Sequence, residues 1–297
     1  MYIFFGDIMK RSKKRLKRII LFITIIISMI YSYKYLDNKN IEIDNKEVVE
    51  MVINNTFKQN SILDKILSFN KENQILLLKE SFDNVVSEKP SGNPIIYIYN
   101  SHPTERYMHS NIGEFSIDPT VIMNNYILED IFNKKGYLTL VEEGSVTEIL
   151  NNNNWNYASS YKASRILMET AKKNNPSLEY FIDVHRDSLS KDKTTITIGD
   201  KDYAKMIFLL GLENPKYEDN LVFMERINNK IDSYYPGLSK GIYKKGGAGV
   251  NGVYNQDFSS KTILIEVGGE ENTTTEVLNS AIAFSRCFLE VLDEESN

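Results

Sequence analysis

Residues 94–105 read PIIYIYNSHPTE, and this stretch decides which fold the sequence predicts. Its first half, 94–99, is an apolar run rich in β-branched and aromatic residues, which is typical of a short buried strand. His102 and Glu105 follow the run at a spacing of three. The chain has only three histidines, and a second one, His109, also falls just after this strand. The sequence therefore gathers ionisable side chains beyond the end of a buried strand.

Strands and helices alternate from this point to the end of the chain. Apolar runs predict further strands, at 136–143, 178–185, 194–199, 205–211 and 261–269. Helical periodicity predicts helices at 124–136, 159–176, within 215–237 and at 273–295. This alternation is typical of an α/β fold in which a mostly parallel, twisted sheet is flanked by helices.

The first 36 residues have the pattern of a membrane anchor. Seven basic residues occur within 10–18, and an uncharged apolar run follows at 19–33. We expect a cytoplasmic basic segment at 1–18 and a single transmembrane helix at 19–36, with the rest of the chain outside the cytoplasm at the cell membrane. A cleaved signal peptide is the alternative, but no pair of small residues marks a cleavage site after residue 33.

The remainder of the chain divides at the Pro/Gly/Ser-rich stretch 87–94. Residues 37–90 predict a partly helical stalk or linker, and 91–297 a catalytic domain. The net charge is −5, and the first 36 residues carry eight Lys/Arg and one acid, so the remaining chain carries −12. An acidic domain excludes a nucleic-acid partner, which requires a basic face. The single cysteine, Cys287, excludes an intrachain disulfide and is predicted to be a core thiol.

Three of the predicted strands lead to ionisable side chains. The strand at 94–99 precedes His102 and Glu105, the strand at 178–185 ends in His185, and Glu266 lies in the last strand. The carboxyl ends of parallel strands meet at one edge of a sheet, so we expect these side chains to converge. Two histidines and a carboxylate are a set of ligands that catalytic zinc uses. The pattern predicts that His102, Glu105 and His185 bind Zn²⁺.

Glu266 is the candidate general base of a hydrolytic site. Its position in an apolar strand predicts a partly buried carboxylate that takes a proton from the attacking water. Asp183 or Asp187 is expected to orient His185.

Several other residues keep two interpretations. Arg106 and Arg186 each follow a predicted ligand. One interpretation is that they bind a substrate carboxylate, and the other is that they form structural ion pairs. His109 is either a substitute ligand or a bystander, and Trp155 either packs in the core or stacks on a sugar ring.

Four stretches of the chain resemble the stage II sporulation protein P family. They are NSHPTERY at 100–107, NYILEDIFNKKGY at 125–137, YFIDVHRDS at 180–188, and GVYNQDFSSKTILIEVGGEENTTTEVLNSA at 252–281. The resemblance covers about residues 94–293. It implies a membrane-anchored, zinc-dependent cell-wall hydrolase with an amidase-like or carboxypeptidase-like sheet. The implied activity is that of an N-acetylmuramoyl-L-alanine amidase acting on peptidoglycan during sporulation and engulfment, with endopeptidase action on cross-links as a further activity.

The resemblance also implies roles and partners. His102 and His185 match the metal-binding histidines, and Glu266 matches the catalytic glutamate. We assign the third ligand to Glu105; related amidases carry it near the start of the next helix, where Glu129 is the nearest but poorly placed glutamate. The implied partners are a glycan-cleaving sporulation protein and a membrane protein that recruits both. Family members often have a longer region between anchor and catalytic domain than the 37–90 segment here.

Two other functions remain open at this stage. A zinc carboxypeptidase-like enzyme shares the order of ligands and requires an arginine for the terminal carboxylate, for which Arg186 is available. A catalytically inactive, wall-binding scaffold is the second alternative. For an amidase, Tyr254, Asn255 and Gln256 are expected to line the substrate groove, because they directly precede the strand of Glu266.

Overall fold

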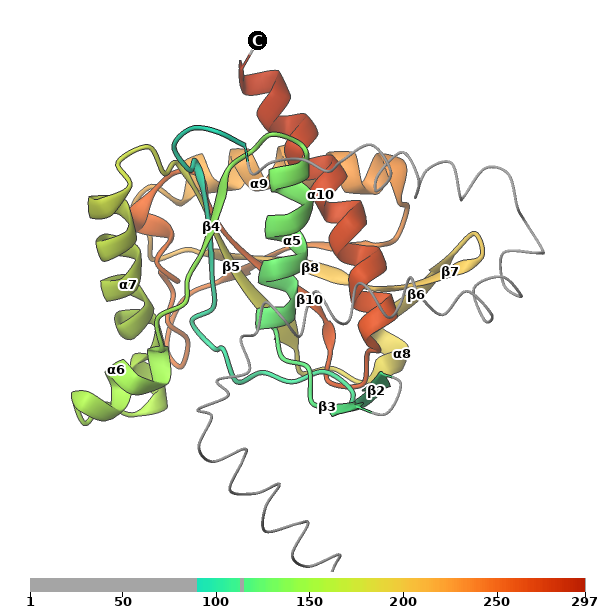
Figure 1. Ribbon diagram of the computed structural model, residues 1–297, viewed down its shortest axis with the longest axis horizontal. Helices are drawn as coiled ribbons and strands as arrows, with labels where there is room; N and C mark the ends of the chain where they lie inside the picture. Colours follow the sequence, from blue (N-terminus) through green and yellow to red (C-terminus); the bar gives the residue numbers. More distant parts are fainter. Residues whose placement is uncertain (1–89, 113–114, 297) are drawn as a thin grey trace, which may run out of the picture. The chain divides into compact units, whose positions relative to one another are not determined.

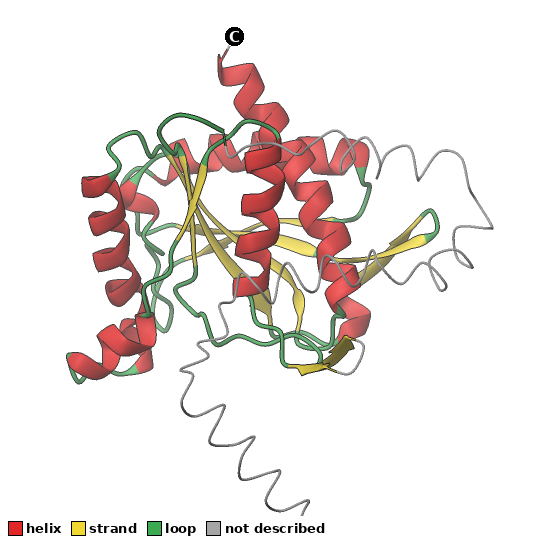
Figure 2. Cartoon of the chain, in the orientation of Figure 1, coloured by secondary structure: helices red, strands yellow, loops and turns green. Residues whose placement is uncertain are grey.

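A six-stranded sheet forms the centre of the molecule in the computed structural model, which describes residues 90–112 and 115–296 (Figure 2). The strand order is β4-β1-β5-β10-β8-β9. In that order the strands are Thr139–Val141, Ile96–Tyr99, Tyr180–Asp187, Thr262–Gly269, Met206–Gly211 and Ser239–Lys245. The first four run parallel to one another, whereas β8 pairs antiparallel with β10 and parallel with β9. The predicted α/β fold with a mostly parallel sheet is therefore confirmed.

Helices cover both faces of this sheet (Figure 1). One face packs against α5 (Ile122–Lys134), α9 (Tyr217–Tyr234) and α10 (Thr274–Ser296). The opposite face packs against α7 (Ser160–Asn174). Side chains alternate between the two faces along each strand. In β5, Ile182 and Val184 therefore enter the larger core, while Phe181 lies on the α7 side.

Shorter elements are added at the edges of this framework. The helix α6 (Val146–Asn152) packs beside α7 and forms a small separate apolar cluster with it. Two hairpins lie outside the main sheet: β2 (Ser110–Ile112) with β3 (Phe115–Ile117), and β6 (Thr195–Ile198) with β7 (Lys201–Ala204). The remaining short helices are η1 (Tyr157–Ser159), α8 (Lys191–Thr194) and η2 (Gln256–Phe258).

The sequence pattern missed part of the sheet. It did not predict β9, whose sequence SKGIYKK lacks the continuous apolar run of a buried strand. The strand lies at the edge of the sheet, where lysines are common because they discourage pairing with another chain. The predicted strand at 194–199 forms the β6–β7 hairpin and does not join the main sheet.

The predicted segments 1–18 and 19–36, and the predicted stalk up to residue 89, lie outside the described residues. Within residues 90–112 and 115–296, the structure contains no helix long and apolar enough to cross a membrane.

The amino terminus of α10 is closed by a reciprocal pair of hydrogen bonds. The Thr273 hydroxyl accepts from the Glu276 backbone N–H at 3.2 Å, and the Glu276 carboxylate accepts from the Thr273 backbone N–H at 2.8 Å. Such a capping box satisfies backbone donors that have no partner within the helix.

We expect Thr273→Ala to lower the free energy of unfolding by about 1 kcal/mol, because it removes the hydroxyl acceptor. Thr273→Ser keeps the hydroxyl and serves as the matched control. Urea denaturation followed by circular dichroism measures both. An equal loss in the two variants would show that the methyl group, and not the cap, matters at this position.

Candidate metal centre

The three predicted ligands come together at one point of the structure. One ligand atom each from His102, Glu105 and His185 lies within 4.8 Å of the other two. His102 Nδ1 is 3.6 Å from one Glu105 carboxylate oxygen, and His185 Nδ1 is 3.4 Å from the other. The two imidazole rings meet edge to face, with centroids 5.0 Å apart. Among the described residues, this is the one group of three or more His, Cys, Asp or Glu side chains that could hold a metal ion.

The loop after β1 is held in place by buried amides from α5. The Asn100 side chain donates to the backbone carbonyl of Val184 in β5, and Asn125 of α5 donates to Asn100. Further along, Asn124 donates to the Tyr107 hydroxyl, which donates in turn to the Val267 carbonyl of β10. His102 and Glu105 lie between these two fixed points, so their positions are set before any ligand binds.

Asp183 orients the His185 ring. It is fully buried on the same side of β5, and one carboxylate oxygen lies 3.0 Å from His185 Nε2. The Ser101 backbone N–H and hydroxyl donate to the two Asp183 oxygens at 2.9 and 2.7 Å. A carboxylate at Nε2 directs Nδ1 toward Glu105 and leaves it as the ring atom available to a metal. Of the two predicted orienting residues, Asp183 therefore has this contact, while Asp187 pairs with Lys240 at 3.3 Å.

The electrostatics of the group favour a bound cation. Burial alone would lower the pKa of His185, but the charge of Asp183 and hydrogen bonds to Asp183 and Glu105 outweigh burial and raise this pKa to about 10. Burial would raise the pKa of Glu105, but hydrogen bonds with His102 and His185 lower it to about 2. The negative charges that hold a proton on His185 would equally stabilise a metal cation.

Glu266 lies beside His185 on the neighbouring strand. The two residues are register partners in the parallel pair β5–β10, so their side chains project from the same face of the sheet. Burial raises the pKa of Glu266 to about 7, and the charge of Asp187 adds to the increase. A pKa near neutrality suits a general base, because the group is partly ionised yet still basic enough to take a proton.

The donor set fits zinc. Tetrahedral zinc binds His nitrogen and carboxylate oxygen at roughly 2.0–2.2 Å, which places its ligand atoms about 3.4 Å apart. The two nitrogen–oxygen separations, 3.4 and 3.6 Å, match this spacing. The ligands supply two neutral nitrogens and one negative oxygen, and three protein ligands leave one position of a tetrahedron open for substrate.

The two predicted substrate arginines have different surroundings. The Arg186 guanidinium donates to the carbonyls of Arg106 and Asp187 and lies 3.6 Å from the Glu270 carboxylate. Its backbone N–H donates to Glu105. Arg186 thus holds the ligand loop against β5, as in its structural interpretation. The Arg106 side chain is exposed, and its contact with a substrate stays a prediction.

The segment before β10 is largely buried. Asn255 donates to the Tyr161 carbonyl and the Ser164 hydroxyl, while Gln256 bonds with the backbone of Leu209 and Gly211. The burial of Asn255 and Gln256, at 7% and 1% exposed, argues against the predicted contact with substrate. Tyr254 is also buried, and its ring meets Tyr161 edge to face.

The alternative ligands lie outside the group. His109 pairs with Asp118 at 2.8 Å on an exposed surface. Glu129, on α5, is not part of the group either. Trp155 packs in the small cluster between α6 and α7, with the Lys162 ammonium 3.7 Å from its ring centre.

Sequence reasoning missed two tyrosines that flank the ligands. The Tyr157 ring stacks on His102 with centroids 4.7 Å apart, and the Tyr161 ring meets His102 edge to face at 5.3 Å. Tyr161 also stacks on His185 at 6.3 Å. Both follow the asparagine-rich stretch 151–154, and only the fold brings them beside His102, which is more than 50 positions earlier in the chain.

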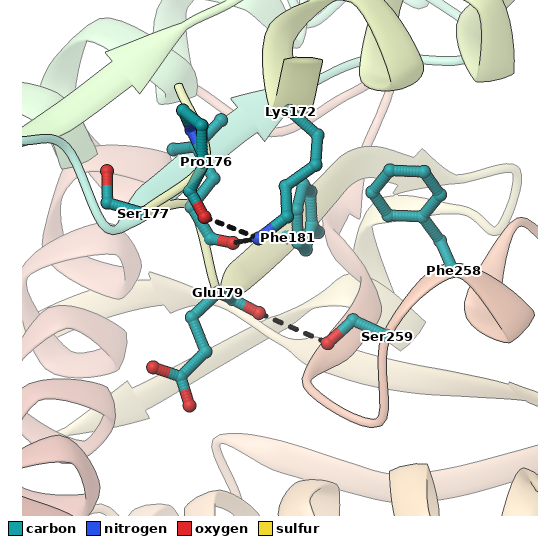
Figure 3. A pocket seen from close by; sticks show the side chains of 8 residues that line it. Lys172, Pro176, Ser177, Glu179, Phe181, Phe258 and Ser259 are labelled. Carbon is teal, nitrogen blue, oxygen red and sulfur yellow. Dashed lines mark hydrogen bonds between the residues drawn. The ribbon is translucent and has the colours of Figure 1, made fainter. Parts of the chain in front are cut away.

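A hollow of about 560 Å³ lies elsewhere on the molecule (Figure 3). It is at the amino end of β5, near Phe181 and Phe258, whereas His185 lies toward the carboxyl end of the same strand. The Lys172 ammonium inside it donates to the carbonyls of Pro176 and Leu178. This hollow is separate from the candidate metal centre.

The chain is similar to known proteins. The family model described as stage II sporulation protein P matches residues 12–289. The chain is 34% identical over 221 residues to the stage II sporulation protein P of Bacillus subtilis (strain 168), which covers 70% of this chain and 55% of the relative. The chain thus spans about half the length of that relative. The solved structure of the CwlD amidase from Clostridioides difficile, in complex with the GerS lipoprotein, is similar with a TM-score of 0.45 and 12% identity, covering 67% of this chain and 98% of that chain.

We expect Asp183→Asn to weaken Zn²⁺ binding about 10- to 100-fold, because the substitution removes the negative charge that orients His185. Competition with a chromophoric chelator measures the affinity. Asp232→Asn, an exposed position on α9, is the control for the substitution itself. Unchanged affinity in Asp183→Asn would show that this carboxylate does not support a metal ligand.

Glu266→Gln is expected to stabilise the metal-free protein. A folded-state pKa of about 7, above the ordinary value of 4.5, means that the folded protein binds this proton more tightly than the unfolded chain does. Stability therefore falls as the pH rises from about 4.5 to about 7 and remains lower above that range. Glutamine removes this loss, so we expect a gain on the order of 2 kcal/mol at pH 8 and none at pH 4.

Urea unfolding in the presence of a chelator, at both pH values, measures the effect. Glu225→Gln, at an exposed position on α9, is the matched control. A gain that is the same at pH 4 and pH 8 would contradict the assignment of a raised carboxyl pKa.

Proposed function

Because the chain belongs to the stage II sporulation protein P family, we propose that it is a zinc-dependent peptidoglycan hydrolase. The bond it cleaves is the amide between the lactyl group of muramic acid and L-alanine of the stem peptide. The observation that carries this proposal is the convergence of His102, Glu105 and His185, with Glu266 next to His185 in register. Peptide cross-links of the wall are a second class of substrate for the same chemistry.

Zinc would be held by His102 Nδ1, His185 Nδ1 and the Glu105 carboxylate. When bound, it supplies Lewis acidity that polarises the scissile carbonyl and lowers the pKa of water to about 7. Neighbouring groups hold these side chains in place. Asp183 and Ser101 contact the His185 ring, and the Arg186 backbone N–H donates to one Glu105 oxygen.

Glu266 carries the proton transfers. Its carboxylate takes a proton from the water that attacks the amide carbonyl, and it gives that proton to the leaving amine of L-alanine. Burial, with the charge of Asp187 adding to it, raises the pKa of Glu266 to about 7, and both transfers require a pKa near neutrality. The products are the lactyl carboxylate on the glycan and a free amino terminus on the peptide.

The proposed location and partners rest on the resemblance to the same family. We propose that 19–36 anchors the chain in the membrane, with 1–18 in the cytoplasm, and that the catalytic domain at 91–297 reaches the wall through the stalk at 37–90. A glycan-cleaving sporulation protein and a membrane protein that recruits both enzymes are the proposed partners. The two activities complement each other because they cut different bonds of the same polymer. This chain would separate stem peptides from the glycan, and the partner would cut the glycan strand itself.

Two alternatives are less well supported. A carboxypeptidase must hold a terminal carboxylate with an arginine, but Arg186 is already engaged with two backbone carbonyls and lies near Glu270. A non-catalytic scaffold needs neither an ordered set of metal ligands nor a carboxylate of raised pKa beside them.

Digestion of defined muropeptides by the full chain in detergent, with mass analysis of the products, tests the proposal. We expect zinc-dependent release of intact stem peptides, loss of activity with chelator and recovery with Zn²⁺. Glu266→Gln should bind Zn²⁺ as well as the wild type but lose at least about 100-fold in kcat. Released terminal amino acids would indicate a carboxypeptidase, and a zinc-loaded chain that releases no product would contradict the proposal.

A further inference from the structure

Tyr157 combines exposure with a direct contact to a predicted metal ligand. Its ring is nearly parallel to the His102 ring, with an angle of 19° and centroids 4.7 Å apart. The side chain is nevertheless 55% exposed, more than any other aromatic residue whose exposure the structure describes. One face of the ring therefore covers His102, while much of the remaining surface is open to solvent.

The segment that carries Tyr157 is anchored. Val146 and Leu150 of α6 pack against Ala163 of α7, and Trp155 joins this cluster. The Trp155 backbone N–H donates to the Leu150 carbonyl at 2.9 Å. At its other end, the Ser160 hydroxyl donates to the Tyr157 carbonyl at 2.7 Å. These contacts place the aromatic ring beside the metal centre before substrate arrives, which lowers the entropic cost of using it for binding.

We propose that Tyr157 is a sugar-binding residue, whose open face receives the pyranose ring of muramic acid. This inference rests on the proposed function. In a muramoyl peptide, only an ether oxygen and one carbon lie between the sugar ring and the scissile carbonyl. When the carbonyl is at the ligands, the sugar must lie within one ring diameter of them, and Tyr157 contacts one of those ligands directly.

The chemistry of the two rings agrees with this placement. The face of a tyrosine ring carries partial negative charge, and a pyranose ring offers a face of weakly positive C–H groups. An aromatic platform binds such a ring by stacking, without the dense hydrogen bonding that a buried sugar needs. It also tolerates a long glycan, because the platform is open at its sides. Trp155 packs in the α6–α7 cluster with the Lys162 ammonium over its ring, and it has no ring contact with a candidate ligand among those the structure describes, whereas Tyr157 has one.

The test compares two substrates of the zinc-loaded full chain. One is N-acetylmuramoyl-tripeptide, and the other is D-lactyl-tripeptide, which has the same amide but no sugar. We expect Tyr157→Ala to raise KM about tenfold for the muramoyl substrate and to leave kcat/KM for the lactyl substrate within about twofold. Tyr157→Trp should keep the wild-type KM. Tyr234→Ala, an exposed tyrosine on α9, is the matched control.

Two outcomes would overturn the inference. An equal loss on both substrates, with weaker Zn²⁺ binding, would mean that Tyr157 only supports the His102 ring. No change on either substrate would mean that the sugar does not contact it.

A binding measurement separates this inference from the proposed function. The disaccharide of N-acetylglucosamine and N-acetylmuramic acid is titrated into the Glu266→Gln protein and its Tyr157→Ala derivative. Binding that is about tenfold weaker in the Tyr157→Ala derivative supports the sugar site. This holds even if the wild-type chain cleaves neither substrate, because absence of cleavage contradicts only the proposed amidase activity. Equal binding by both proteins overturns the sugar site even if the amidase is active.

Discussion

The buried negative charge of Asp183 is the constraint on which the candidate site depends. A carboxylate with no exposure to solvent is costly unless it is fully hydrogen bonded and paired with positive charge. Its partners come from two places in the chain: the backbone and hydroxyl of Ser101, and the imidazole of His185. Satisfying this one charge fixes the loop after β1 against the strand β5. The candidate metal ligands His102, Glu105 and His185 are positioned as a result.

The position of β5 near the centre of the sheet extends this order to Glu266, the candidate base. With β1 on one side and β10 on the other, β5 receives His102 and Glu105 from the first neighbour and Glu266 from the second. The shape of the centre is therefore set by backbone pairing between strands, which is the most rigid part of such a domain. The loop contributes two candidate ligands, but buried amides from α5 and the Arg186 backbone hold it to the same strands.

The sequence predicts the candidate ligands and base better than it predicts the residues that hold them in place. The apolar runs that become β1, β5 and β10 are continuous, and the ionisable residues stand out because the chain has so few histidines. The supporting contacts follow no local pattern: Ser101 and Asp183 are 82 positions apart, and Tyr157 is far in sequence from His102. Asn124 and Asn125 looked like ordinary helix residues, and only the fold shows that both are buried and bonded to the ligand loop. The polar strand β9 was missed for the opposite reason, since an exposed edge needs no apolar run.

The small cluster around Leu150 is separate from the core that holds the sheet together. Tyr157, which stacks on His102, is held in place by this small cluster and not by the main core. The order of the aromatic ring and the order of the candidate ligands therefore depend on different sets of contacts, and either can be lost without the other.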